Sequence, residues 1–241
     1  MTSIIIATKD RLWHLQNLID SIRRYTDDYE IIVVDDVSKD GTWEWLEDQD
    51  VTSLTYPESI PVADAWNKGC EVAKGHYIQI LNDDMEVTPN WLSNQIELYK
   101  TVNNPGVFAA HLLRGEEVLS RGGKFLGTQL VPVPSIDEVQ KVDYSNTPFM
   151  SKHVWHSVGK FKAHAQMYYE DADFGLKCLK RNKVNLYNPL SVIKHVTLGW
   201  RPEDGQEQFE RRQHNESVIQ QKARESFMKD WREYLENRSN G

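Results

Sequence analysis

The sequence predicts an α/β protein in which helices flank a mostly parallel sheet. Short apolar runs, typical of strands buried on both faces, alternate with stretches whose apolar residues recur at helical spacing. No internal repeat or low-complexity tract interrupts this alternation. Strands and helices that alternate along a chain form parallel sheets with right-handed crossover connections, and ligands bind beyond the carboxyl ends of such strands.

The first 113 residues carry the alternation most clearly. The first strand is the apolar run Ser3-Ile-Ile-Ile-Ala7, and the helix after it has leucines and isoleucines spaced along one face. Further apolar runs predict the strands 30–35, 51–56, 77–81 and 107–113. Periodic stretches between them predict the helices 12–25, 41–48, 62–74 and 90–103.

The pattern changes after residue 113. Residues 114–148 are rich in glycine and proline, which predicts a loop-rich or hairpin segment. A helix is expected at 170–181 and a strand at 183–187. From residue 203 a long amphipathic helix is expected, with apolar residues spaced four apart at Ile219, Ala223, Phe227 and Trp231. The predicted divisions are therefore 1–113, 114–200 and 201–241.

Composition excludes some classes of protein. The 241 residues include 28 Lys and Arg against 36 Asp and Glu, a net charge of −8, which argues against binding of nucleic acid through phosphate neutralisation. No apolar run is long enough for a transmembrane segment. Cys70 and Cys178 show no metal or redox spacing and are expected to be buried thiols of a cytoplasmic protein. Of the eight tryptophans, Trp66 and Trp91 are expected in the core and Trp231 on the docking face of the last helix.

Two of the predicted strands end in acidic residues. Asp35-Asp36 follows the strand 30–35, and Asn82-Asp83-Asp84 follows the strand 77–81. Carboxylates gathered at one sheet edge repel one another unless a cation compensates, and Mg²⁺ or Mn²⁺ between carboxylate and phosphates is a common solution. The alternative is that these acids only form turns and helix caps. Neither GxGxxG nor GxxxxGK[ST] is present, so a metal is expected to hold the phosphates.

Several stretches of the sequence together form an ordered set of motifs: Ile4–Arg11, Ile32–Thr42, Ala65–Gly69 with Ala73–Gly75, Leu81–Leu92, Val158–Phe161, Tyr169–Leu179 and His195. In this set and in its order, the chain resembles family-two glycosyltransferases with the A-type, Rossmann-like fold. The resemblance covers residues 3 to about 113 and 147 to 196. It implies a nucleotide-sugar-binding half at 1–113 and an acceptor-binding and catalytic-base half at 114–200.

The resemblance also implies roles for individual residues. The nucleotide would be enclosed by Thr8, Arg11, Asp36, Asn67 and Asp83. The stretch Asn82-Asp83-Asp84 stands at the family's DxD position, where Asp84 would bind Mn²⁺ or Mg²⁺ between the donor phosphates. His195 matches a position that completes the metal site in some relatives. Asn82 stands where many members have Asp, which leaves Asp84 as the firm carboxylate ligand.

The expected base is Asp171, at the start of the helix 170–181. It would take a proton from the acceptor hydroxyl as that oxygen attacks the anomeric carbon, and a single displacement of this kind inverts the sugar. Glu170 is the alternative catalytic carboxylate, and Asp173 is a further alternative or a sugar or acceptor contact. Trp200 is expected to stack on a sugar face or to cover the diphosphate.

The expected reaction is the transfer of one sugar from a nucleoside-diphosphate donor, by default UDP or dTDP, to a glycan, lipid-linked or other hydroxyl acceptor. The Q-x-x-R-W element and membrane helices of processive relatives are missing. A sugar nucleotidyltransferase is an alternative, although the G-x-G-T-R-x-x-P pattern is absent, and a non-catalytic nucleotide-sugar-binding module is another. Cytoplasmic location is expected, with transient binding at the inner membrane face left open.

Overall fold

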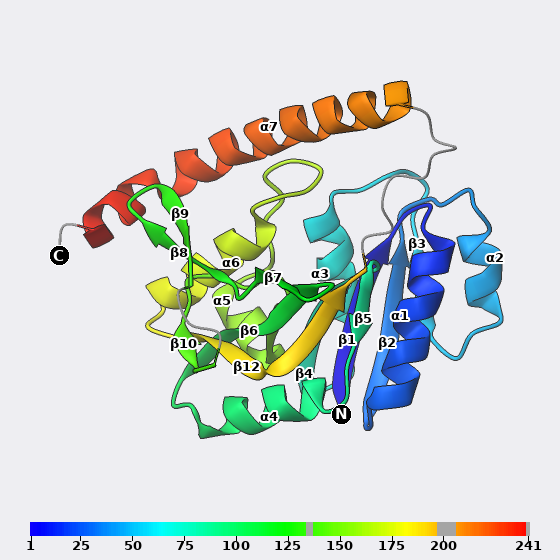
Figure 1. The fold of residues 1–241 in the computed structure, drawn as a ribbon, viewed down its shortest axis with the longest axis horizontal. Helices are drawn as coiled ribbons and strands as arrows, with labels where there is room; N and C mark the ends of the chain where they lie inside the picture. Colours follow the sequence, from blue (N-terminus) through cyan, green and yellow to red (C-terminus); the bar gives the residue numbers. More distant parts are fainter. Residues whose placement is uncertain (134–136, 197–205, 240–241) are drawn as a thin grey trace.

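A computed structural model describes residues 1–133, 137–196 and 206–239 (Figure 1). The strands are β1 (Thr2–Thr8), β2 (Tyr29–Asp35), β3 (Thr52–Thr55), β4 (Tyr77–Asn82), β5 (Met85–Val87), β6 (Pro105–Arg114), β7 (Glu117–Ser120), β8 (Gly123–Leu126), β9 (Gln129–Pro132), β10 (Gln140–Lys141), β11 (Phe149–Ser151) and β12 (Val184–His195). The helices are α1 (Leu12–Tyr25), α2 (Thr42–Glu47), α3 (Val62–Val72), α4 (Trp91–Thr101), α5 (Lys152–Val158), α6 (Glu170–Lys180) and α7 (Gln206–Ser239).

One central sheet runs in the order β10-β12-β6-β11-β4-β1-β2-β3, with β5 paired to β12 and β7 to β6. The pairs β1–β2, β1–β4, β2–β3 and β6–β12 are parallel. The α/β class predicted from the alternation is confirmed. Because β12 pairs with β6, the same sheet crosses the predicted boundary at residue 113.

The helices cover the two faces of this sheet because successive side chains of a strand point in opposite directions. Ile4 and Ile6 of β1 pack in a core cluster with α1, α2 and α4, whereas Ile5 packs in a second cluster with α3, α5 and α6. Trp91 lies in the first cluster and Trp66 in the second, so both expected core tryptophans are confirmed.

Among the strands that differ from the sequence-based expectation are β11 and β12. The three-residue strand β11 lies between β4 and β6 and is antiparallel to both, and a run this short carries no periodicity that would have predicted it. Strand β12 was expected to stop before Asn188-Pro189 but continues to His195. A register shift between Asn188 and Val192 accommodates the proline, as bulges in strands do.

The segment 114–148 contains hairpin strands, as the glycine and proline content predicted. Strand β7 turns back on β6, and β8 and β9 form a separate two-stranded hairpin beside the body of the protein (Figure 1). The backbone at Gly123 and Tyr144 forms an isolated bridge that ties this hairpin to the chain before β11.

The last helix, α7, lies across α6 and the β8–β9 hairpin (Figure 1). Phe227, Trp231 and Leu235 are buried and pack against Leu176 of α6 and Tyr144. Trp231 therefore lies on the docking face of this helix, as predicted. Within the described ranges, none of the helices has both the length and the apolar character of a membrane span. Cys70 and Cys178 are buried, free thiols.

Candidate active site

The carboxyl ends of β1, β2 and β4 bring the first group of predicted residues together. The backbone register pairs Thr8 with Asp35 and Ala7 with Asn82, so the residues that follow each strand meet at one edge. The hydroxyl of Thr8 donates to Oδ2 of Asp83 at 2.8 Å. The backbone carbonyl of Thr8 accepts from the N–H of Asp36 at 2.8 Å.

Asp36 stands one residue beyond β2, and its carboxylate accepts three hydrogen bonds from other residues. Oδ2 accepts from the hydroxyl of Ser59 at 2.6 Å and from Nζ of Lys9 at 2.9 Å. Oδ1 accepts from the backbone N–H of Ile60 at 2.8 Å. These three donors come from two loops and fix the carboxylate at the rim of the site.

Arg11 bridges the two acids after β4. Its NH1 lies 2.8 Å from Oδ2 of Asp84 and 3.4 Å from Oδ1 of Asp83. Burial raises the pKa of Asp83 to about 6, while the Arg11 charge lowers that pKa and the Asp84 charge raises it. The guanidinium thus offsets part of the repulsion between the two neighbouring carboxylates.

His195 reaches Asp84 through strand pairing. β12 runs antiparallel to β5 with His195 opposite Met85, and the N–H of Val196 donates to the carbonyl of Asp84 at 2.7 Å. Nε2 of His195 consequently lies 3.6 Å from Oδ2 of Asp84. The structure therefore brings together the two residues that the resemblance names as metal ligands.

The Asp84–His195 pair fits a divalent cation. Oδ1 of Asp84 and Nδ1 of His195 are buried without a hydrogen-bond partner among the described residues. Buried polar atoms without partners are costly, and a carboxylate oxygen with an imidazole nitrogen is a donor set that Mn²⁺ accepts.

The predicted base lies in a second group at the start of α6. Burial raises the pKa of Asp171 and, together with the Asp171 charge, that of Glu170. Oδ1 of Asp171 accepts from the N–H of Ala172 at 2.8 Å, and Oδ2 accepts from Nδ2 of Asn146 at 3.2 Å. These two carboxyls are therefore held close together in a poorly hydrated place, where acid and base roles are commonly found.

The backbone that leads into α6 is strained. Tyr168 and Tyr169 have φ values of 81° and 68°, which bulky residues rarely adopt. The ring of Tyr169 stacks on Phe227 of α7 with ring centroids 4.9 Å apart. In the same loop, Nε2 of Gln166 donates to the carbonyl of Ile60 at 2.7 Å. The loop before α6 thus contacts both α7 and the loop that holds Asp36.

Asn67, which was expected near the nucleotide, places its side chain between α3 and the loop after α5. Its side chain is buried, with Nδ2 donating to the carbonyl of Phe161 at 2.9 Å and Oδ1 accepting from the N–H of Phe161 at 2.9 Å. Oδ1 also accepts from the indole of Trp155 at 3.4 Å. Asn67 therefore joins α3 to the loop after α5. Helical spacing alone could not tell this inner position from a solvent-facing one.

Asp173 was expected to contact sugar or acceptor, but the structure buries it against α7. Its Oδ1 accepts from the indole N–H of Trp231 at 2.8 Å, and its Oδ2 lies 2.5 Å from Nζ of Lys177. These partners, with His164, lower its pKa against a burial effect in the other direction. Asp173 lies on the face of α6 that the last helix covers, where it joins α6 to α7.

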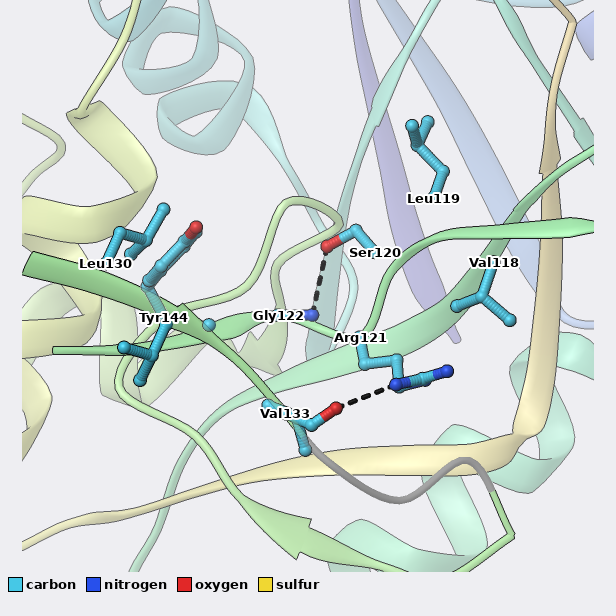
Figure 2. Close-up of a pocket in the computed structure, with 10 residues that line it drawn as sticks. Val118, Leu119, Ser120, Arg121, Gly122, Leu130, Val133 and Tyr144 are labelled. Atoms are coloured by element: carbon cyan, nitrogen blue, oxygen red, sulfur yellow. Dashed lines mark hydrogen bonds between the residues drawn. The ribbon is translucent and has the colours of Figure 1, made fainter.

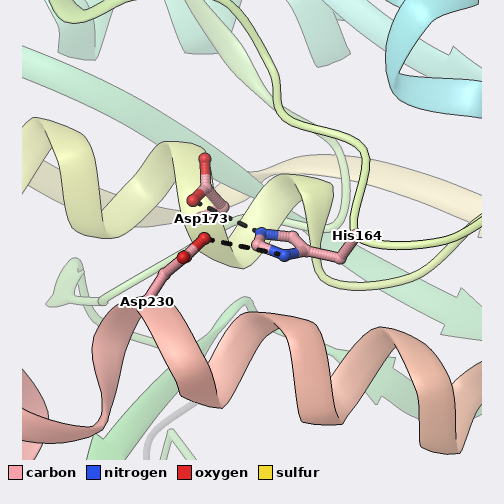
Figure 3. Close-up of side chains that lie close together, drawn as sticks. All are labelled: His164, Asp173 and Asp230. Atoms are coloured by element: carbon pink, nitrogen blue, oxygen red, sulfur yellow. Dashed lines mark ion pairs between the residues drawn. The ribbon is translucent and has the colours of Figure 1, made fainter.

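Asp173 belongs to a cluster that also contains His164 and Asp230 (Figure 3). Nε2 of His164 lies 3.4 Å from Oδ1 of Asp173, and its Nδ1 lies 4.0 Å from Oδ2 of Asp230. The three ligand atoms lie within 4.8 Å of one another, as a metal site needs. However, Lys177 pairs with Asp173 and Lys162 with Asp230. The cluster and its lysines therefore also form an ion-pair network between α6, the loop before it and α7.

A cavity of about 300 Å³ lies under the β7–β9 segment (Figure 2). It is lined by both apolar and polar residues: Val118, Leu119, Ser120, Arg121, Gly122, Gly123, Leu130, Val131, Val133 and Tyr144. Ser120 donates to Oδ1 of Asn146, whose Nδ2 donates to Asp171. The cavity wall is thus connected to the predicted base. Sequence reasoning missed these residues because nothing in the segment 114–148 indicated which of its side chains meet.

Trp200, the expected sugar contact, lies outside the described residues. The other predicted positions form two groups. Thr8, Arg11, Asp36, Asp83, Asp84 and His195 gather at the strand ends, and Glu170 and Asp171 lie at the start of α6.

Known proteins resemble this chain in sequence and in structure. The model of the family described as glycosyl transferase family 2 matches residues 3–156. An uncharacterized glycosyltransferase of Rickettsia bellii is 30% identical over 135 residues, which is 52% of this chain and 18% of the relative. The uncharacterized protein y4gI of Sinorhizobium fredii is 33% identical over 116 residues, 44% of this chain and 12% of the relative. The chain therefore spans less than a fifth of the length of these curated relatives.

Two solved proteins share the fold. The structure of GalNAc-T7 with UDP, GalNAc and Mn²⁺ superposes with a TM-score of 0.70 at 17% identity, over 83% of this chain and 44% of that one. TarS of S. aureus superposes with a TM-score of 0.60 at 15% identity, over 80% of this chain and 34% of that one. The family model covers more than half of the chain, and with these folds it leads to one conclusion: the chain belongs to glycosyltransferase family 2.

Proposed function

We propose that this chain transfers a single sugar from a nucleoside-diphosphate sugar to an acceptor hydroxyl, with inversion at the anomeric carbon. The observation that carries the proposal is the pairing of Asp84 with His195 beside Arg11 and Asp83 at the strand ends. Those groups suit a diphosphate and its cation. A buried carboxyl pair at the start of α6 supplies the basic group that the reaction also needs.

Asp36 and Thr8 are the proposed contacts for the nucleoside. The Asp36 carboxylate is held at the rim by three donors, and a pyrimidine imide N–H would add a fourth. Thr8 and Arg11 orient the carboxylate of Asp83, which we propose accepts a hydrogen bond from a ribose hydroxyl. GalNAc-T7, which has the same fold, was solved with UDP. UDP or dTDP is therefore the proposed leaving group.

Asp84 and His195 are the proposed holders of the cation, Mn²⁺ or Mg²⁺. When bound, the cation supplies Lewis-acid stabilisation of the charge that the leaving diphosphate acquires. The two buried atoms without partners, Oδ1 of Asp84 and Nδ1 of His195, support this assignment. Arg11, 2.8 Å from Asp84, adds a fixed positive charge on the same side.

Asp171 is the proposed base. Its carboxyl and that of Glu170 interact, so the protonation of one changes the pKa of the other. The backbone N–H groups at the start of α6 favour an ionised carboxylate there. In the transfer step the acceptor oxygen attacks the anomeric carbon, its proton passes to Asp171, and the bond from the sugar to the diphosphate breaks.

A panel of nucleoside diphosphates in a thermal-shift assay, with and without Mn²⁺, tests the donor half of the proposal. UDP or dTDP with Mn²⁺ should raise the unfolding free energy by about 2.7 kcal/mol at a hundredfold excess over its Kd. EDTA should remove the effect. The proposal fails if no nucleoside diphosphate stabilises the protein. The Asp171→Asn variant separates an enzyme from a binding module, since it should bind UDP normally and lose transfer.

The cavity under the β7–β9 segment is the proposed acceptor site. It has polar and apolar walls, as a sugar acceptor requires, and its Ser120 is connected to the base through Asn146. With a glycan acceptor found by screening, Leu130→Trp should lower transfer about tenfold by filling the cavity, while donor hydrolysis by water continues. Leu126→Trp is the matched control, because Leu126 is an exposed leucine of the same hairpin outside the cavity lining.

A further inference from the structure

Asn146 makes a specific contact with the proposed base. Its Nδ2 lies 3.2 Å from Oδ2 of Asp171, and among the described residues it is the one side chain that donates to that carboxylate. The other oxygen of Asp171, Oδ1, accepts from the backbone N–H of Ala172 at 2.8 Å. One oxygen of the base is therefore oriented by the helix and the other by Asn146.

A directed series of hydrogen bonds sets the orientation of the Asn146 amide. The N–H of Gly122 donates to Oγ of Ser120 at 3.1 Å, so the Ser120 proton is free to point elsewhere. It points to Oδ1 of Asn146. Because Oδ1 accepts from Ser120, the NH₂ group of the same amide faces Asp171. The series begins on residues that line the cavity and ends on the base.

The backbone next to Asn146 is anchored in the central sheet. Oγ1 of Thr147 accepts from the N–H of Ala110 at 3.1 Å, and the carbonyl of Thr147 accepts from Nε2 of Gln79 at 3.1 Å. The carbonyl of Pro148 accepts from the N–H of Ile80 at 2.9 Å. A residue held by β4 and β6 moves little, which is what positioning of a catalytic group requires.

Two ionisable groups interact with the Asp171 carboxyl. Burial together with the Asp171 charge raises the pKa of Glu170, and the same two causes raise the pKa of the Tyr144 phenol. Burial raises the pKa of Asp171, whereas the bond from Asn146 lowers it. Because Asn146 donates to Asp171, it favours placing the negative charge of the pair on Asp171 rather than on Glu170.

We propose that Asn146 is a positioning residue that holds the Asp171 carboxylate ionised and aimed, and that links it through Ser120 to the wall of the acceptor cavity. This proposal rests on the function proposed above, since it assigns the base to Asp171. Asn146 itself takes no proton; it acts through the carboxylate to which it donates.

The test combines a titration with a rate measurement on the full chain. Carboxyl ¹³C NMR titrations follow the pKa of Asp171, which is assigned with Asp171→Asn, in wild type, Asn146→Ala and Asn146→Asp. Asn146→Ala should raise that pKa by about one unit, because a hydrogen bond to the charged form is lost. Asn146→Asp should raise it further, because it adds a like charge.

The control is Asn104→Ala. Nδ2 of Asn104 donates to the carbonyl of Asn182, just beyond the other end of α6, so this variant loses a comparable bond away from the base. Its titration should coincide with that of wild type. If Asn146→Ala and Asn146→Asp also titrate like wild type, Asn146 does not position the base. A shift of equal size in Asn104→Ala would likewise overturn the proposal.

The rate measurement uses hydrolysis of UDP-N-acetylgalactosamine, UDP-glucose and UDP-galactose with Mn²⁺, with water as the acceptor. For the sugar that wild type hydrolyses, Asn146→Ala should lower kcat at pH 7 about tenfold, move the acidic limb of the pH profile upward and leave KM within twofold. If the acidic limb of the pH profile of Asn146→Ala coincides with that of wild type, Asn146 does not position the base. If wild type binds no nucleotide and hydrolyses no donor, the proposed function fails, and the NMR titration still decides the role of Asn146.

Discussion

The indole N–H of Trp231 donates to Oδ1 of Asp173 at 2.8 Å, and this bond joins the last helix to the helix that begins with the proposed base. Asp173 is almost completely buried and also faces His164 and Lys177. A buried carboxylate is tolerated only with such partners. The contact therefore couples the docking of α7 to the geometry of α6.

Trp231→Phe should lower the free energy of unfolding by about 1–3 kcal/mol, because a hydrogen bond to a buried charge is lost while most of the ring packing stays. Urea unfolding measures the change. Trp13→Phe is the matched control, since Trp13 is 44% exposed and its replacement should change stability by less than about 0.5 kcal/mol. Equal stability of the two variants would contradict a docking role for the Trp231–Asp173 bond.

Asp84→Asn should reduce Mn²⁺-dependent donor turnover by about 100-fold or more, because an amide replaces the proposed anionic ligand of the cation. Turnover at a series of Mn²⁺ concentrations measures both affinity and rate. The control is Glu86→Gln on the adjacent strand β5, whose side chain is half-exposed and pairs with Lys194. The assignment of Asp84 is wrong if both variants respond to Mn²⁺ as wild type does.

Asn67→Ala should destabilise the protein by about 3 kcal/mol, since the backbone N–H and carbonyl of Phe161 would lose their partner inside the core. UDP affinity at a temperature where the variant is folded should stay within twofold of wild type. Lys68→Ala, at the exposed neighbouring position, should alter stability little. A large loss of UDP affinity in Asn67→Ala would restore the nucleotide contact expected from the sequence.

The raised pKa of Glu170 predicts the pH dependence of stability. A carboxyl whose pKa is raised in the native state binds more protons when folded than when unfolded. The stability that Glu170 contributes is therefore fully present below its unfolded pKa of about 4.5, and it is lost as the pH rises toward the native pKa of about 8. Glu170→Gln removes that loss. The variant should be more stable than wild type by about 1 kcal/mol or more at pH 9, and the difference should shrink toward pH 4.

Urea unfolding across this pH range measures the two stability curves. Glu236→Gln, at an exposed position of α7, provides the comparison and should follow wild type throughout. Parallel curves for wild type and Glu170→Gln would show that the native environment does not raise the pKa of Glu170.

The sequence predicted where the strand-end residues lie, because parallel strands place their carboxyl ends at one edge. The positions of Asp83 and Asp84 could be predicted from the strand that precedes them. The distant His195 was named only because of the family resemblance. Pairing between β5 and β12, which joins His195 to Asp84, involves a three-residue strand that no pattern revealed. The chemistry was thus predictable where local strand order sufficed.

Asn67 and Asp173 have surroundings that the sequence did not predict, for one physical reason. Both are polar residues on amphipathic helices, and sequence spacing does not tell which polar positions face solvent and which meet another element. Asp173 lies two residues from Asp171 yet points to α7, a helix that begins far later in the chain. Asn146 and Ser120 were missed for the same reason, because their roles arise only when distant segments meet.

The pairing of β12 with β5 also has a consequence for the order in which the molecule matures. Asp84 is synthesised early, but the proposed cation site lacks its imidazole until the chain up to His195 has emerged and its final strand has added to the sheet. Capture of Mn²⁺ should therefore report completed folding. A nascent or truncated chain that ends before β12 contains the proposed nucleotide contacts at the ends of β1, β2 and β4. It would still lack His195, one of the two proposed ligands of the ion.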